Sequence, residues 1–188
     1  MTVAGLVLAA GAGRRFGGPK ALVELDGERL VDRMVRVLRA GGCQPLVVVA
    51  GAVPLAVSGA TVVDNPDWRT GMGSSLRSGL AALPDQASAA VVVLVDTPWI
   101  GPDAVGRLVQ AHATGAALAV ATYAGVRGHP VLLGRTHWRG AAASAVGDSG
   151  ASNYLASNPN VVEVDCTGTG DPRDVDHPSQ IGGRSRGS

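Results

Sequence analysis

LVLAAGAGRRFGGPK, residues 6–20, is the segment around which the rest of this chain is organised. Its apolar start belongs to a run from Val3 to Ala9 that predicts a buried strand. The run then breaks into a loop with four glycines, whose backbone can pass close to a ligand and present bare N–H groups to an anion. Arg14, Arg15 and Lys20 add positive charges suited to phosphate. Lys20 is the only lysine of the chain, which indicates that a compact ammonium group is needed at this point.

Two familiar phosphate-binding loops do not fit this stretch. The dinucleotide fingerprint requires a third glycine where this chain has Phe16, and an acid after the second strand, where this chain has Gly51. A Walker A loop requires a hydroxyl side chain after its lysine, whereas this chain has Pro19 before Lys20 and Ala21 after it. Without a further comparison, a glycine-rich loop with solvated charges stays open as the structural alternative.

Composition limits the possible classes of protein. The length of 188 residues suits one domain, and 46% hydrophobic residues with 3% aromatics predict a core of Ala, Val and Leu. A net charge of +1 without a basic stripe argues against nucleic acid as a partner. There is no apolar run of membrane-spanning length and no basic segment typical of a signal peptide, and Cys43 and Cys166 have no C-x-x-C partner. We therefore expect a cytoplasmic protein with no membrane partner.

Strand-like and helix-like segments alternate along the whole chain. This alternation predicts an α/β fold, a three-layer, doubly wound, mostly parallel sheet of the Rossmann-like kind. We expect one domain over residues 1–180 and a disordered tail over residues 181–188. The expected strands cover residues 3–9, 46–50, 60–63, 90–95, 117–123, 130–133 and 161–164, and the main expected helices residues 30–40, 74–82, 102–113, 138–146 and 152–156. Ligands of such sheets bind beyond the carboxyl ends of the strands.

Asp96 follows the most strand-like run of the chain, residues 90–95. It should therefore lie at the same sheet edge as the glycine loop. Magnesium ions join carboxylates to nucleotide phosphates, so a metal ligand is the favoured interpretation. A helix cap is the plainer alternative for an aspartate at this place.

Five segments together resemble the MobA-like nucleotidyltransferases. They are the opening loop, the run VLVDTP at residues 93–98, the segment DVDHPSQ at residues 174–180, the segment from Asn65 to Leu80, and Gly128-His129-Pro130. The resemblance implies a fold of the nucleotide-diphospho-sugar transferase type. It also implies Lys20, Arg15 and Asp96 as catalytic residues, and Asp96 with Asp176 as ligands of Mg²⁺. The nucleotide-binding residues that it implies are Leu8, Ala9, Ala10, Gly11, Gly13, Arg14, Arg15, Lys20, Asn65 and Ser75, although Ser75 reads equally well as a helix cap.

The resemblance further implies the reaction. A phosphate of an acceptor attacks the α-phosphorus of a nucleoside triphosphate, and pyrophosphate leaves. Ala10 and Pro19 match the cytidylyl-transferring branch, which predicts CTP as the donor. The G-H-P segment matches the branch that handles molybdopterin, which implies molybdopterin as the acceptor, contacts to it from His129 and Asp148, and a molybdoenzyme or its chaperone as a protein partner. His177, Ser179 and Gln180 depart from the family pattern near the expected metal site.

Three other functions stay open from the sequence. The chain resembles the guanylyl-transferring branch less, but the loop alone does not exclude GTP. An NAD(P)H-dependent oxidoreductase of the nicotine blue type is a second possibility, because such an activity has been assigned to some relatives of the family. A nonenzymatic protein that handles or delivers a cofactor is the third. Pyrophosphate release, NADPH oxidation, or neither would separate these classes.

Overall fold

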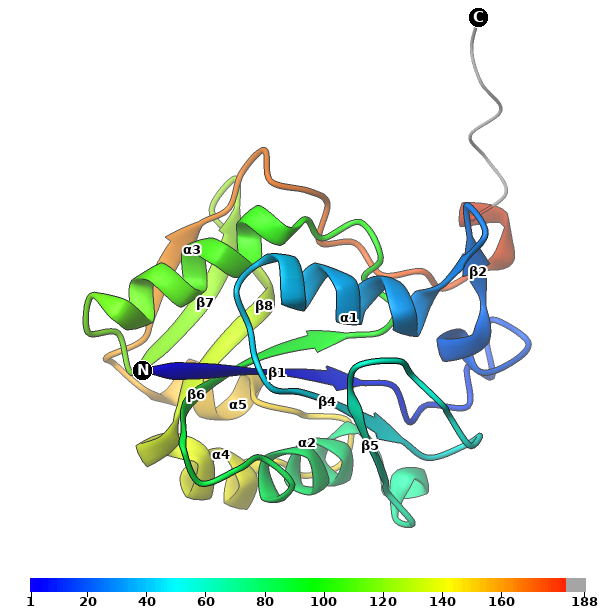
Figure 1. The fold of residues 1–188 in the computed structure, drawn as a ribbon, viewed down its shortest axis with the longest axis horizontal. Coiled ribbons are helices and arrows are strands. Elements are labelled where there is room, and N and C mark those ends of the chain that lie inside the picture. Colours follow the sequence, from blue (N-terminus) through cyan, green and yellow to red (C-terminus); the bar gives the residue numbers. More distant parts are fainter. Residues whose placement is uncertain (182–188) are drawn as a thin grey trace, which may run out of the picture.

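A seven-stranded sheet forms the centre of the computed structural model, which describes residues 1–181 (Figure 1). The strand order is β5-β4-β1-β6-β8-β7-β9. The strands are β1 (Thr2–Leu8), β4 (Leu46–Ala50), β5 (Thr61–Asp64), β6 (Ala87–Leu94), β7 (Leu118–Tyr123), β8 (Val126–Gly134) and β9 (Val162–Asp165). The pairs of β1 with β4 and β6, of β4 with β5, and of β7 with β9 are parallel. The predicted doubly wound, mostly parallel sheet is confirmed.

The middle strands are covered on both faces. Every residue of β4 is buried, as are Val3 to Leu8 in β1, which explains why these strands read as unbroken apolar runs. Leu6 of β1 lies beside Val47 on one side and Val92 on the other, so the three strands end together at one edge of the sheet. That edge carries the site described below.

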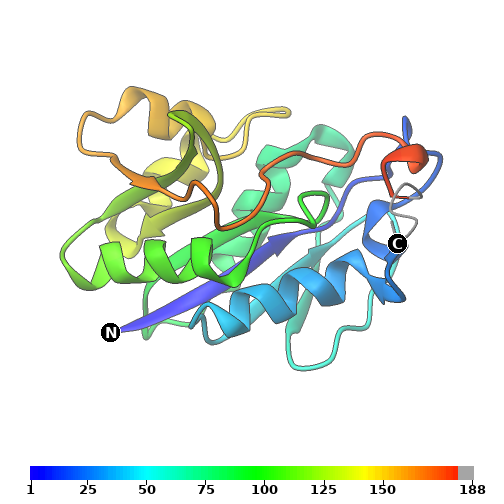
Figure 2. The same cartoon turned by 90° about the horizontal axis from the view of Figure 1, so that it is seen from above.

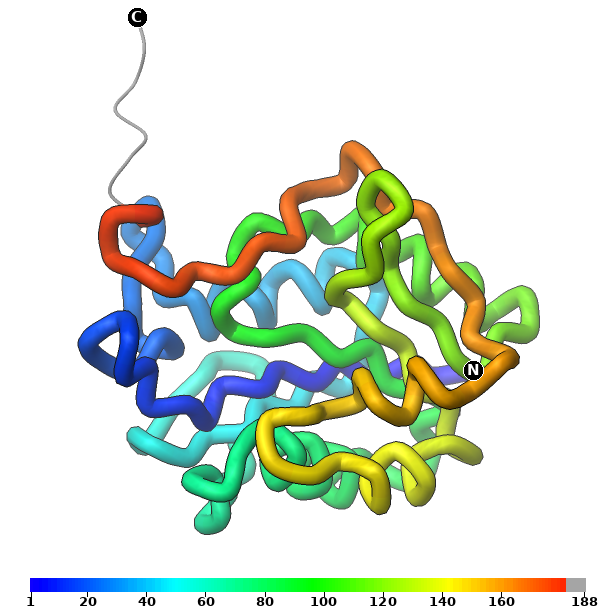
Figure 3. Tube along the Cα trace, turned by 180° about the vertical axis from the view of Figure 1, so that it is seen from behind, coloured from blue at the N-terminus to red at the C-terminus, as the bar shows by residue number. Residues whose placement is uncertain are grey.

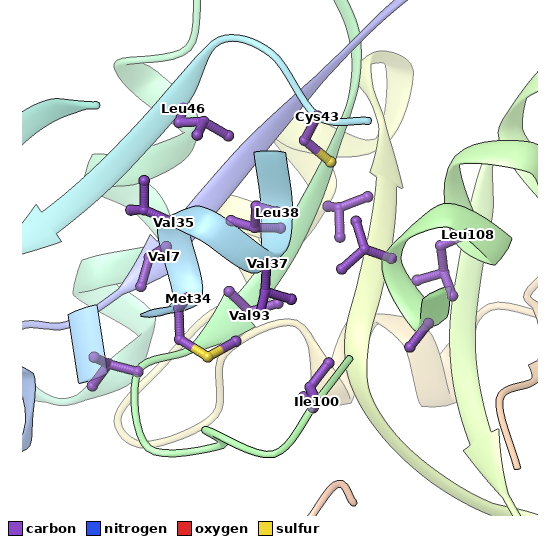
Figure 4. Packing of buried hydrophobic residues seen from close by; sticks show 14 of the residues in the cluster. Val7, Met34, Val35, Val37, Leu38, Cys43, Leu46, Val93, Ile100 and Leu108 are labelled. Atoms are coloured by element: carbon purple, nitrogen blue, oxygen red, sulfur yellow. The ribbon is translucent and has the colours of Figure 1, made fainter. Parts of the chain in front are cut away.

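Helices pack on the two faces in separate groups. The helices are α1 (Leu30–Ala40), α2 (Met72–Ala81), α3 (Pro102–Ala113), α4 (Trp138–Ser144) and α5 (Ser152–Ser157). In Figure 1, α1 and α3 cover one face, and α2, α4 and α5 cover the other. Leu38 of α1 and Leu108 of α3 pack on the first face with Val7 and Val93 (Figure 4). Leu76 of α2 packs on the opposite face with a second, separate core cluster.

One strand reverses the direction of the sheet. Strand β8 is antiparallel to both β6 and β7, and its pairing with β7 shifts register between Val120 and Ala121. Two very short strands, β2 (Glu24–Leu25) and β3 (Glu28–Arg29), form a separate antiparallel pair just before α1. Within residues 1–181, four 3₁₀ turns complete the elements: η1 (Lys20–Leu22), η2 (Trp68–Thr70), η3 (Arg135–His137) and η4 (Pro178–Gln180).

The last described segment returns from β9 toward the β2 region, as Figures 2 and 3 show. Val175 in this segment is fully buried, and its N–H donates to the Asp96 carbonyl at 2.8 Å. Ile181 packs against the core cluster on the α1 and α3 face. The predicted disordered tail otherwise concerns residues 182–188, which lie outside the described residues. No helix within residues 1–181 is long and apolar enough to cross a membrane.

Candidate active site

The chain changes direction across the sheet at β1. From β1 it proceeds to β4 and β5 on one side, and then returns to β6 on the other side. The carboxyl ends of β1 and β6 lie beside each other at this switch point, which is the place where sheets of this kind bind their ligands. A cleft of about 680 Å³ lies here, within the range of small-molecule sites. Residues of the glycine loop and Asp96 line it, as the sequence predicts.

The glycine loop presents an uninterrupted run of free donors. Within the described part of the chain, no group accepts a hydrogen bond from the backbone N–H of any residue from 10 to 16. The loop closes on itself instead through Gly17 and Gly18, whose N–H groups both donate to the Gly13 carbonyl, at 2.9 and 3.1 Å. Gly13 has a φ of +59°, and an added Cβ would collide with the Gly18 carbonyl oxygen, so this position requires glycine. Such a loop is suited to cradle an anion.

Two arginines of the same loop are available for a ligand. Arg14 and Arg15 are exposed, and both line the cleft. Neither forms an ion pair or hydrogen bond with another residue among those described. Leu8, Ala10 and Gly11 also line the cleft, whereas Ala9 is buried behind it and does not.

Lys20 joins the two predicted metal ligands. Its Nζ lies 2.9 Å from Oδ2 of Asp96 and 3.4 Å from Oδ1 of Asp176. The three side chains are 14%, 23% and 38% exposed, respectively, so Lys20 and Asp96 are largely covered while Asp176 stays open to the cleft. Lys20 and Asp176 are thus in contact although they lie 156 positions apart in the chain.

The structure does not place Asp96 at the cap of the helix that follows it. The helix after Asp96 is α3, which begins at Pro102 and has Gly101 as its N-cap. Asp96 is therefore too far from that helix to cap it. Two carboxylates facing a triphosphate-sized cleft are the donor set that Mg²⁺ prefers, because this ion usually takes one or two carboxylates and completes its shell with phosphates and water. No group of three or more His, Cys, Asp or Glu side chains that could hold a metal occurs among residues 1–181.

Asn65 and Ser75 lie at different depths on the side of the cleft that faces the glycine loop. Ser75 lines the cleft, whereas Asn65 is buried behind it. Asn65 Nδ2 donates to Ser74 Oγ at 2.8 Å and to Ser75 Oγ at 3.1 Å. Ser75 does not cap α2, because that helix begins at Met72 without a side-chain cap. The Ser75 hydroxyl accepts from Asn65 and keeps its own proton for a ligand, so Asn65 supports the wall and Ser75 faces the cleft.

The loop of Asp148 is fastened to the start of α2. Gly73 N–H donates to the Gly147 carbonyl at 2.8 Å, and Arg77 of α2 donates to the Ala145 carbonyl. Gly71, with a φ of +108°, approaches Gly147 and Asp148 so closely that no side chain would fit there. These contacts place the Asp148 side chain in the cleft lining.

His129 does not line the cleft. It lies in β8 at the irregular pairing with β7, and its carbonyl accepts a hydrogen bond from the Tyr123 hydroxyl at 2.9 Å. Part of the residue is exposed, but its ring is surrounded closely enough that burial lowers its pKa to about 4. His129 is therefore neutral near pH 7 and offers no positive charge to a phosphate in this structure.

Some lining residues were not singled out by the sequence. The Arg69 guanidinium stacks 4.5 Å from the centre of the Trp68 ring, and both side chains line the cleft. Asp174 lines it too, beside Asp176. The only sequence signal for these residues was their place inside two recognised segments. The lining thus carries both signs of charge, with Arg14, Arg15, Lys20 and Arg69 against Asp96, Asp148, Asp174 and Asp176. An anion and a cation bound together suit this arrangement.

Comparisons with known proteins identify the family and the fold. The model of the MobA-like NTP transferase domain matches residues 5–162. The chain is 36% identical, over 95% of its length and 94% of the relative's, to nicotine blue oxidoreductase of Paenarthrobacter nicotinovorans. It is also similar to Rv0371c of Mycobacterium tuberculosis H37Rv, with 28% identity, a TM-score of 0.80, and coverage of 94% and 93% of the two chains. Another structure of Rv0371c is a complex with manganese.

A more distant structure shares the fold. The 2-C-methyl-D-erythritol 4-phosphate cytidylyltransferase of Thermus thermophilus superposes with a TM-score of 0.73 at 21% identity, covering 96% of each chain.

Proposed function

This chain belongs to the MobA-like NTP transferase domain family, and we propose that it transfers CMP from CTP to a phosphorylated acceptor, with molybdenum-bearing molybdopterin as the first candidate. The observation that carries the nucleotidyl transfer is the run of free N–H groups over residues 10–16 beside Lys20, Asp96 and Asp176. That arrangement offers donors to a polyphosphate and carboxylates to a divalent cation in one cleft.

The reaction is a displacement at phosphorus. An acceptor phosphate oxygen forms a bond to the α-phosphorus of the nucleotide, and the bond from that phosphorus to the β-phosphate bridging oxygen breaks, releasing pyrophosphate. An acceptor phosphate is already ionised at neutral pH, so no general base is needed. Among the described residues, no histidine lines the cleft, which is consistent with catalysis by positioning and charge neutralisation.

The glycine loop, Lys20, Asp96 and Asp176 have separate tasks in this proposal. The N–H groups of the glycine loop, with Arg14 and Arg15, hold the β- and γ-phosphates. Asp96 and Asp176 would hold Mg²⁺, which would neutralise charge on the α-phosphate and the attacking oxygen. Lys20 pairs with both carboxylates in the structure, and its flexible side chain can move from them to the phosphates of a bound nucleotide.

Ser75 and Asp148 are the proposed contacts from α2 and from the loop fastened to its start. Ser75 has a hydroxyl proton to donate to the nucleoside, and Asp148 can accept hydrogen bonds from amino groups of the acceptor. Asn65 acts behind Ser75. The role of His129 at the acceptor stays a prediction from the resemblance, since this residue lies outside the cleft lining.

The choice of CTP rests on Ala10 and Pro19, which match the cytidylyl-transferring branch. Parallel assays with CTP and GTP, each with Mg²⁺ and molybdopterin, test it by the pyrophosphate released. We expect faster turnover with CTP; equal or faster turnover with GTP would assign the chain to the guanylyl-transferring branch. If CTP is the donor, a molybdoenzyme or its chaperone is the expected recipient of the product.

A second candidate is an NAD(P)H-dependent oxidoreductase, because a relative that matches nearly the whole chain is named nicotine blue oxidoreductase. The sequence supports it less, since Phe16 and Gly51 depart from the dinucleotide fingerprint. Loss of NADPH absorbance with a quinonoid dye, in the absence of any triphosphate, would favour this candidate. Pyrophosphate release without NADPH consumption would favour the transferase.

A further inference from the structure

Asp176 reaches the cleft from a segment without regular structure. Residues 171–176 form neither helix nor strand, and the Asp176 side chain is 38% exposed. Its contact with Lys20, at 3.4 Å, is longer than that of Asp96. A carboxylate in such a place does not stay at a metal site by itself, so other contacts must fix its backbone.

One anchor lies directly before Asp176. The Val175 side chain is fully buried, and the Val175 N–H donates to the Asp96 carbonyl at 2.8 Å. This bond ties the two acidic positions to each other through the backbone. It makes no contact with the N–H of Asp176 or with the residues that follow.

The second anchor is the side chain of Gln180. Its Oε1 accepts hydrogen bonds from the N–H groups of Asp176 and His177, both at 2.7 Å. Its Nε2 lies 3.4 Å from the Asp174 carbonyl, which it reaches as a donor. One amide group thus contacts the backbone on both sides of Asp176. Gln180 is itself held in the turn η4, where its N–H donates to the His177 carbonyl at 3.0 Å.

From this geometry we propose that Gln180 is the positioning residue for the metal-binding carboxylate of Asp176. The proposal rests on the metal role that the proposed function gives to Asp176. An amide oxygen accepts the two N–H groups without adding charge, which matters because four acidic side chains already line the cleft. The departure of Gln180 from the family pattern therefore replaces an acid with a neutral acceptor in the same turn.

The test measures binding of Mn²⁺ alone, by the electron paramagnetic resonance signal of the free ion. Gln180→Met keeps the length of the side chain but loses the acceptor, so we expect Mn²⁺ affinity to fall by about fivefold, the effect of one or two lost hydrogen bonds. Gln180→Glu keeps an acceptor and should bind Mn²⁺ at least as tightly as the wild type. Ser179→Ala, a neighbouring exposed position, is the matched control and should change nothing.

A double-mutant cycle separates positioning from a general effect on the fold. Asp176→Asn alone should weaken Mn²⁺ binding, and adding Gln180→Met to it should cause no further loss. Wild-type Mn²⁺ affinity in Gln180→Met, a fivefold loss in Gln180→Glu, or an undiminished loss in the Asp176→Asn background would each overturn the proposal. These affinities are measured without turnover. A failure to release pyrophosphate from any triphosphate would therefore contradict the proposed function without affecting the measured Mn²⁺ affinities.

Discussion

The two walls of the cleft are built in different ways. The first wall, residues 10–20 together with Asp96, follows directly from the ends of β1 and β6. The second wall, the start of α2 with residues 145–151, consists of a helix end and a loop that are fastened to each other by hydrogen bonds. The first wall exposes bare N–H groups and charged side chains, whereas the second exposes one hydroxyl and one carboxylate over a supporting network.

This difference indicates that the first wall provides most of the catalytic effect of the site. Charge that develops on phosphate is stabilised most by donors that are already in place, so changes in the first wall should reduce catalysis strongly. Contacts of the second wall are single hydrogen bonds to a nucleoside or acceptor, which contribute about 0.5–1.5 kcal/mol each. Variants of the two walls should therefore differ in the size and in the kind of their effect.

The largest effect is expected for Asp96→Asn. Asparagine has nearly the same shape but no charge, so the fold should persist while Mg²⁺ binding weakens. We expect turnover to fall by at least about a hundredfold, with part of it recovered at high Mg²⁺ or Mn²⁺. Steady-state assays across metal concentrations measure this, with the exposed Asp103→Asn in α3 as a control of the same chemistry. Wild-type turnover of Asp96→Asn at ordinary Mg²⁺ would exclude Asp96 from the site.

Lys20→Ala should lower turnover by about two orders of magnitude, comparable to the loss of one preorganised donor, in a protein that stays folded. The same variant should bind the metal ion more tightly than the wild type does. Removing the ammonium group from between Asp96 and Asp176 should raise the Mn²⁺ affinity of the nucleotide-free protein by about fivefold, which corresponds to ~1 kcal/mol for a partly exposed ion pair.

Lys20→Arg is the matched variant for that experiment. It keeps the positive charge, so Mn²⁺ affinity should not rise, while the bulkier guanidinium should still reduce turnover. If Lys20→Ala binds Mn²⁺ no better than the wild type, the lysine does not compete with a cation at the two carboxylates. Turnover near the wild-type value would make it an ordinary surface residue.

Ser75→Ala tests the second wall and should have a smaller effect. The variant loses one donated hydrogen bond, so we expect the dissociation constant for CTP to rise by about fivefold with little change in the turnover number. Titration calorimetry in the presence of Mg²⁺ measures it. Ser78→Ala, on the same helix but outside the cleft lining, should bind CTP as the wild type does. A hundredfold loss of turnover in Ser75→Ala would remove the distinction between the walls.

The smallest effect on turnover is expected for His129, which lies outside both walls and should affect stability instead. Because burial lowers the pKa of its ring to about 4, the folded protein binds this proton less readily than the unfolded chain does. Protonation of His129 thus has no effect on the free energy of unfolding above about pH 6.5. As the pH falls from there toward 4, the unfolded chain takes up this proton first, and the folded state loses stability. His129→Gln should flatten the decline of the unfolding temperature over that range. An unchanged slope would mean that the ring is solvated.

The first wall was predictable from the sequence because its residues follow strands directly. A buried apolar run ends at a definite residue, so Gly11, Lys20 and Asp96 could be placed at one edge from the pattern alone. The second wall was less predictable. That Asn65 lies behind Ser75 depends on hydrogen bonds within a turn, and the position of Asp148 depends on a glycine contact between two segments far apart in the chain, at Gly71 and Gly147. Neither arrangement produces a periodic pattern in the sequence from which it could be predicted.

The effect of the departure from the family pattern at Gln180 was also not predictable from the sequence. In the sequence, Gln180 was one of three departures from the family pattern near the expected metal ligand Asp176, at a position where the pattern has an acid. In the structure its amide oxygen accepts the backbone N–H groups of Asp176 and His177. A substitution that changes charge but keeps a hydrogen-bond acceptor cannot be judged from residue type alone, because the contact is made to the backbone.

Titration calorimetry of CTP binding, with Mg²⁺ and with EDTA in its place, tests whether the nucleotide and the metal ion bind together in the cleft. If triphosphate and divalent cation share the cleft through Asp96 and Asp176, CTP should bind at least about tenfold more tightly with Mg²⁺, a coupling of about 1.4 kcal/mol. Asp96→Asn should abolish that difference. Equal CTP affinity with Mg²⁺ and with EDTA, or NADPH that binds and displaces CTP, would contradict the account.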